Sequence, residues 1–186
     1  NLTITLKRAN SEVHIFWYLF YEGNLMFVSD SSIFVFGLTH KQVGLTLFIS
    51  CSALILFPLL MQSTKRLLGK EQANTELKTI LLSSSLIALF FFYFNTQMHE
   101  RYIHSALIFS TALAFLYSAW GQWIFLSLAY ALSLESICKI LKLENYGTLI
   151  FHQKFISLLY AISLALLIYH WLKTKPLKGC FKGWVG

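Results

Sequence analysis

The sequence has few charged residues, few prolines and few cysteines. Asp, Glu, Lys and Arg make up 12% of its 186 residues, with two prolines and three cysteines. Three cysteines cannot all pair, and Cys51 and Cys138 lie inside apolar runs, so neither a disulfide framework nor a metal site is indicated. The sequence also has no zinc-type histidine spacing, no glycine-rich phosphate loop and no nucleophile elbow. Soluble nucleotide and hydrolase chemistries therefore have no support. No cofactor is predicted, and a requirement for a divalent metal stays open.

Hydrophobic residues, in contrast, account for 56% of the chain, and the mean hydropathy is +0.61. This composition is typical of an integral membrane protein rather than a water-soluble globule. The formal net charge is +7, but the basic residues stand between apolar runs rather than along one exposed face. We therefore expect contacts with membrane lipid and no nucleic-acid partner.

The apolar runs predict an all-α fold, a polytopic transmembrane helical bundle of about five spans that forms a single domain over residues 1–186. The first expected span, residues 43–61, has about the ~20 residues needed to cross the bilayer, and Pro58 is expected to kink it. The second and third spans are expected at 80–94 and 103–119. After a turn at 120–123 the fourth span ends near residue 137, and the fifth is expected at 155–172. Residues 11–21 predict a short interfacial helix rich in aromatics, and residues 28–40 a re-entrant or interfacial loop.

The basic residues predict the orientation of this bundle. Cytoplasmic loops of membrane proteins carry an excess of Lys and Arg. One side would hold Lys65, Arg66, Lys70, Lys78, Lys173, Lys175, Lys178 and Lys182, and the other Lys41, Arg101, Lys139, Lys142 and Lys154. The excess assigns the first side, with the C-terminus, to the cytoplasm. The other side would face the periplasm or the lumen of the endoplasmic reticulum.

A polar block at residues 95–104, Asn-Thr-Gln-Met-His-Glu-Arg-Tyr-Ile-His, separates two of the apolar runs. If helical geometry persists through it, Asn95 and His99, Gln97 and Arg101, and Glu100 and His104 lie on neighbouring faces. The Arg101 guanidinium can hold a phosphate through two parallel hydrogen bonds, and His99 can add another or carry a proton. Glu100 would then order Arg101 or His104, and Tyr102 would lie at the headgroup level or against a sugar. The alternative is that Arg101, Tyr102 and His104 only anchor a helix end at the interface.

Met98-His99-Glu100-Arg101-Tyr102 resembles a signature of polytopic glycosyltransferases of the GT-C type, in particular mannosyltransferases related to the GPI second mannosyltransferase. The order of features from about residue 10 to residue 119 is similar to that family as well. The resemblance implies an active site on the lumenal or periplasmic side. There a sugar would pass, with inversion at its anomeric carbon, from a polyprenyl-phosphate donor to an acceptor glycan, lipid or protein. His99 and Arg101 would bind the donor phosphate, supported by Gln97, Glu100, Tyr102 and His104.

The family's catalytic base is typically an Asp in the first outer loop. Here the only Asp is Asp30, which follows an aromatic segment unlike that loop, so it is a weak candidate for the base. Because the chain does not begin with Met, we expect it to be the C-terminal part of a longer protein whose catalytic Asp lies upstream.

Two other classes stay open: a transporter or lipid flippase whose substrate path the block lines, and a non-catalytic membrane subunit with the block as an interface. Interrupted helices and internal repeats are typical of transporters, and neither is clear here. Glu135 is a further candidate, since an ionisable group in a membrane helix is often functional. An ion pair with Lys139, four residues on, explains Glu135 equally well.

Overall fold

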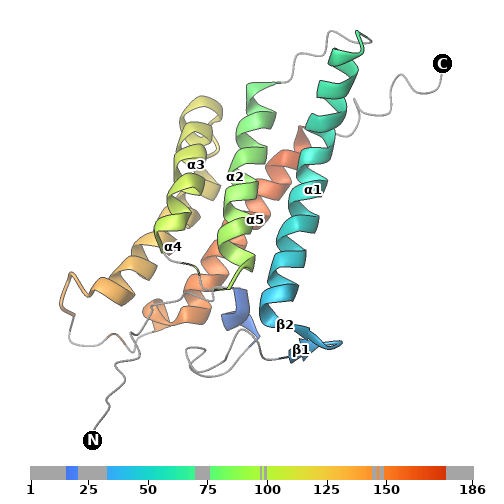
Figure 1. Cartoon of the computed structure of the whole chain (residues 1–186). Helices are drawn as coiled ribbons and strands as arrows, with labels where there is room; N and C mark the ends of the chain where they lie inside the picture. Colours follow the sequence, from blue (N-terminus) through green and yellow to red (C-terminus); the bar gives the residue numbers. More distant parts are fainter. Residues whose placement is uncertain are drawn as a thin grey trace, which may run out of the picture.

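The computed structural model describes residues 16–20, 33–69, 76–96, 98, 100–143, 146 and 149–174. Five α-helices dominate this part of the chain (Figure 1). They are α1 (His40–Leu67), α2 (Leu77–Phe94), α3 (His104–Tyr117), α4 (Trp120–Cys138) and α5 (Gln153–Lys173). Short 3-10 turns are η1 (Phe16–Leu19), η3 (Glu100–Ile103) and η4 (Leu149–Phe151), and β1 (Ile33–Val35) pairs with β2 (Leu38–Thr39).

The predicted all-α helical bundle is confirmed, with a helix at each of the five expected positions, but only three of the described helices have the length and hydropathy of a membrane span. Among the described residues, α1, α2 and α5 are long and apolar enough to cross a membrane. α1 continues through Pro58 as one helix. The chain is therefore an integral membrane protein by the length and composition of these helices.

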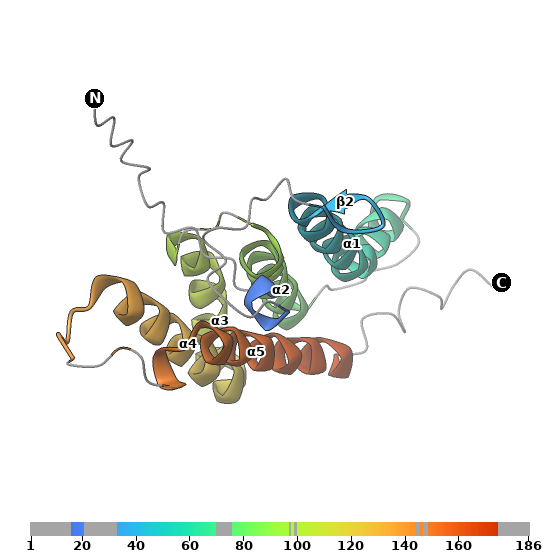
Figure 2. The same ribbon diagram turned by 90° about the horizontal axis from the view of Figure 1, so that it is seen from below.

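Helix α2 lies at the centre of the bundle. It contacts α1, α3 and α5, while α4 packs against α3 and α5 (Figures 1 and 2). Its sequence is mostly apolar, and its uncharged serines at 83–85 are small, as suits a helix packed against three others. Leu86, Leu89 and Phe92 of α2 are fully buried and form the middle of the core.

Small polar side chains hold the buried helices in register. The Ser85 and Ser110 hydroxyls lie 2.8 Å apart and join α2 to α3, and Ser163 of α5 donates to the Gln122 carbonyl of α4 over 2.9 Å. The Trp171 indole of α5 donates to the Ser83 hydroxyl of α2 over 3.2 Å. Such bonds hold membrane helices together where lipid supplies no hydrophobic driving force between them.

Part of the segment expected as a re-entrant or interfacial loop forms the β1–β2 hairpin, because the turn at Phe36 and Gly37 lets its two short strands pair. One local prediction was wrong. The turn expected at residues 120–123 lies earlier, at Ser118 and Ala119, where Ser118 adopts a left-handed conformation (φ 54°) and ends α3. An interfacial helix was expected at residues 11–21. The part of this segment that the structure describes forms the 3-10 turn η1.

The end of the bundle that carries the polar block is here called the block end. It comprises the hairpin, η1, η3, the first residues of α1, α3 and α5 and the last of α2 and α4. Trp17 of η1 is 1% exposed, and its ring lies 4.9 Å from that of His40 and 5.0 Å from that of Phe34. Phe16 packs edge-on against Tyr93 and Phe94. Aromatic contacts thus join the hairpin and the start of α1 to the end of α2.

Candidate functional site

The polar block is not a continuous helix. α2 ends at Phe94, and Asn95 is extended (φ −73°, ψ 154°), with its side-chain amide donating to the Phe91 carbonyl over 2.9 Å. The chain resumes helical geometry at η3, which leads directly into α3. Helical geometry therefore does not persist at Asn95, and a helical pair that starts at Asn95 does not form. Gln97, His99 and Asp30 lie outside the described residues, and Glu100 is described by its backbone alone.

Two apolar residues anchor the block to the core. Met98 is 7% exposed, and Ile103 is completely buried. Between them, Arg101 and Tyr102 are exposed, so the 3-10 turn holds their side chains at the surface of the bundle. The Arg101 guanidinium carbon lies 5.7 Å from the centre of the Tyr102 ring. A cation–π contact of this kind holds the guanidinium beside the ring, and its N–H groups can still bind an anion.

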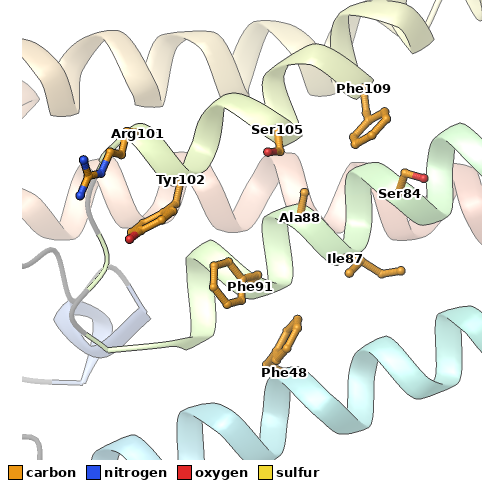
Figure 3. A pocket seen from close by; sticks show the side chains of 9 residues that line it. All are labelled: Phe48, Ser84, Ile87, Ala88, Phe91, Arg101, Tyr102, Ser105 and Phe109. Carbon is orange, nitrogen blue, oxygen red and sulfur yellow. The ribbon is translucent and has the colours of Figure 1, made fainter.

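Arg101 and Tyr102 stand at one end of a groove of about 480 Å³ between α1, α2 and α3 (Figure 3). Such a volume falls within the range of small-molecule sites. The groove is lined mainly by apolar side chains, with two serines, and its members are Phe48, Ser84, Ile87, Ala88, Phe91, Arg101, Tyr102, Ser105 and Phe109.

The floor of the groove is the face of α2 that Ser84, Ala88 and Phe91 share. These residues follow helical spacing, so the floor runs for about 10 Å along the helix axis. Phe91 joins the two walls: its ring lies 5.4 Å from Phe48 of α1 and 6.1 Å from Tyr102 of η3. The groove therefore has an apolar trough along α2 and a cationic end at Arg101.

His104 belongs to a different surface. Its Nε2 lies 2.7 Å from the Tyr130 hydroxyl of α4, and the two rings meet edge-on at 5.5 Å. His104 therefore joins α3 to α4, whereas Arg101 and Tyr102 line the groove between α1 and α3. The structure brings together two of the predicted site residues, Arg101 and Tyr102, and places His104 apart from them.

Glu135, near the end of α4, accepts hydrogen bonds from Tyr146 and Leu141. Its Oε1 accepts hydrogen bonds from the Tyr146 hydroxyl over 2.5 Å and from the Leu141 backbone N–H over 2.9 Å. Lys139 instead lies 5.5 Å from the centre of the Tyr146 ring. The carboxylate thus holds the segment after α4 against the helix end, which is a structural role.

Burial, and then the hydrogen bond to Glu135, raise the pKa of Tyr146 above its usual value of 10.0. The protonated phenol therefore stabilises the fold fully below pH 10.0, and this contribution is lost as the pH rises through the raised pKa. We expect the difference in ultraviolet absorbance between the native protein and Tyr146→Phe to show one phenol that ionises above pH 10.0. In Glu135→Gln the same phenol should ionise at lower pH. A midpoint at or below 10.0 in the native protein would contradict this assignment.

The lining of the groove by α1 and α2 was not predicted from the sequence. A signal was present, because Ser84 and Ala88 stand four residues apart in a span otherwise rich in bulky side chains. Small residues on one face of a membrane helix leave room either for another helix or for a ligand.

The described residues contain no group of three or more His, Cys, Asp or Glu that could hold a metal ion. No family model, no curated protein and no solved structure matches the chain.

Proposed function

We propose that this chain is the membrane part of a glycosyltransferase of the GT-C type, similar to mannosyltransferases, which takes a sugar from a polyprenyl-phosphate donor and transfers it to a glycan, lipid or protein. The observation that carries the proposal is the groove, in which an apolar trough ends at an exposed arginine. A lipid-linked sugar has the matching form, an apolar chain joined to a phosphate that carries the sugar.

The polyprenyl chain would lie along α2, between Phe48 and Phe109, where apolar side chains line the groove. The phosphate would then meet Arg101, whose guanidinium can donate two parallel hydrogen bonds to it. Tyr102 lies beside that guanidinium and would contact the phosphate or the sugar. His99, Glu100 and Gln97 would complete the phosphate contacts from the same block.

The donor would be used on the lumenal or periplasmic side, in the bacterial inner membrane or the endoplasmic reticulum. The excess of basic residues on the loops and tail of the opposite end supports a cytoplasmic position for that end. Among described side chains, those that line the groove include no carboxylate, so these residues would bind the donor and the base would come from elsewhere in the protein.

A transfer assay tests the proposal. Proteoliposomes holding the full-length protein would receive a radiolabelled polyprenyl-phosphate mannose and a glycolipid acceptor. We expect a labelled acceptor product to form. Passage of the label across the membrane with no glycosylated product would identify a transporter or flippase instead and would overturn the proposal.

A groove-filling variant tests the place of binding. Ala88→Phe inserts a ring into the floor of the groove and should raise the KM for the lipid-linked donor by about tenfold, since blocking a few apolar contacts costs on the order of 1–2 kcal/mol. Ala131→Phe is the matched control, because Ala131 is exposed on α4 outside the groove. Equal KM values for the two variants would show that the donor binds elsewhere.

A further inference from the structure

The β1–β2 hairpin has an apolar surface that nothing in the described part of the chain covers. Ile33 is 71% exposed and Phe36 97% exposed, and Val35 and Leu38 are each more than one third exposed. A hairpin in water normally has one polar face. This one carries apolar side chains on both sides of its strands.

The backbone of the hairpin turn makes Phe36 unusual. Phe36 and Gly37 both have positive φ angles, 50° and 78°, as in the tight two-residue turns that favour Asn-Gly or Gly-Gly. A bulky residue with positive φ is an outlier. Here the outlier places a large apolar side chain at the exposed tip.

The hairpin is held firmly to the bundle. The Thr39 hydroxyl accepts from the Gln42 backbone N–H, and the Gln42 side chain accepts from the Thr39 backbone N–H, so a capping box joins β2 to α1. On the other strand, the Phe34 ring lies 5.0 Å from Trp17 and 5.1 Å from His40. The tip thus projects from a fixed base.

The position of the hairpin favours lipid as the partner that covers its apolar surface. It lies beside the block end of α1, on the side away from α5 (Figures 1 and 2). Of the three helices that could cross a membrane, α1 is the least buried within the chain, 22% against 50% for α2 and 44% for α5. Its exposed apolar residues, among them Leu45 and Ile49, are open to lipid along a helix that can cross the membrane, and the hairpin continues that apolar surface past the helix end.

We propose that the hairpin enters the lipid leaflet at the block end, with Phe36 and Ile33 among the upper acyl carbons. Lys41, exposed directly after the hairpin, contacts a lipid phosphate while its stem lies along apolar surface. Interfacial elements of this kind bury apolar side chains about 5–10 Å below the headgroup boundary. The hairpin thereby fixes the height of α1 in the membrane, independently of any glycosyltransferase activity.

Fluorescent labels on single cysteines test this. Cys51, Cys138 and Cys180 would be replaced by serine, and an environment-sensitive label attached to Phe36→Cys or Ile33→Cys in the full chain. Ile49→Cys, within α1, gives the response of a site inside the bilayer. Phosphatidylcholine vesicles would carry nitroxide lipids with the quencher near the headgroup or near the chain end.

We expect blue-shifted emission from both hairpin labels, with stronger quenching by the shallow nitroxide than by the deep one. Quenching by aqueous iodide, with no effect of nitroxide lipids, would place the hairpin in water. Blue-shifted emission that neither quencher reduces would mean that protein, such as a second copy of the chain, covers it. Either result overturns the proposal. Thermal unfolding of the labelled variants, compared with that of the unlabelled parent, checks that they are folded.

Discussion

Arg101→Ala is expected to lower kcat/KM for a polyprenyl-phosphate sugar by about 30-fold to 100-fold in the full-length protein. Hydrogen bonds to a charged group contribute about 1.5–3 kcal/mol, and the loss of two parallel bonds places the effect in the upper part of this range, about 2–2.7 kcal/mol. Since each 1.36 kcal/mol is a factor of ten in rate, this corresponds to about 30-fold to 100-fold. The alanine variant loses both the positive charge and the N–H groups that would bind the phosphate. Transfer of labelled sugar at varied donor concentration, with acceptor in excess, measures the effect.

Arg101→Lys separates charge from geometry. Lysine keeps the positive charge but cannot form two parallel hydrogen bonds, so this variant should lose about tenfold and lie between the native protein and the alanine variant. Because Arg101 is exposed, both variants should keep the native Tm. Lys142→Ala is the control, since Lys142 is an exposed cation at the block end that does not line the groove. Native activity in Arg101→Ala would remove Arg101 from the site and leave it as a helix anchor.

The helices of this fold could be predicted from the sequence because hydrocarbon imposes a strong rule. Spans that must satisfy every backbone group internally are helices, and apolar runs of sufficient length mark them. The expected second span, residues 80–94, ends at the same residue as α2, Phe94. The hairpin was missed because its strands are two and three residues long, too short for an alternating pattern to be recognised.

The candidate site was only partly predictable. Arg101 was singled out for its chemistry, which depends on residue type. The groove beside it depends on which faces of α1, α2 and α3 meet. The small residues Ser84 and Ala88 indicate a face of α2 with room beside it, but they do not tell whether another helix or a ligand fills that room. The side-chain pairs considered for the block depended on helical geometry persisting through it, but Asn95 is extended and ends α2, so a helical pair that starts at Asn95 is lost.

Gly44 is the point at which α1 meets the start of the polar block. It is buried in α1, and a Cβ atom added to it would collide with the Phe94 carbonyl oxygen and would lie 3.3 Å from the Phe94 carbonyl carbon. These are backbone atoms at the end of α2, directly before Asn95. Close approach of two helix backbones at glycine is the usual way in which membrane helices pack tightly. The height of α1 and the position of the block are therefore coupled through this contact.

Gly44→Ala is accordingly expected to destabilise the protein by about 1–3 kcal/mol, the usual cost of adding a methyl group where there is no room. The Phe94 backbone cannot rotate away as a side chain would, so α1 and α2 must separate. The measurement is thermal unfolding in detergent, followed by the loss of helical circular dichroism, with Gly44→Ala compared to the native protein at equal detergent concentration.

Gly121→Ala provides a matched control within the same chain. Gly121 is also helical, but an added Cβ would lie 3.9 Å from its nearest neighbour, the Leu166 side chain, which is ordinary contact. Because alanine favours helix over glycine by up to about 1 kcal/mol, Gly121→Ala should leave Tm unchanged or raise it. A Gly44→Ala variant that matches Gly121→Ala in Tm would show that α1 and α2 are not in backbone contact at the polar block. A lowered Tm in Gly44→Ala alone would show that the backbones of α1 and α2 are in tight contact at the start of the polar block.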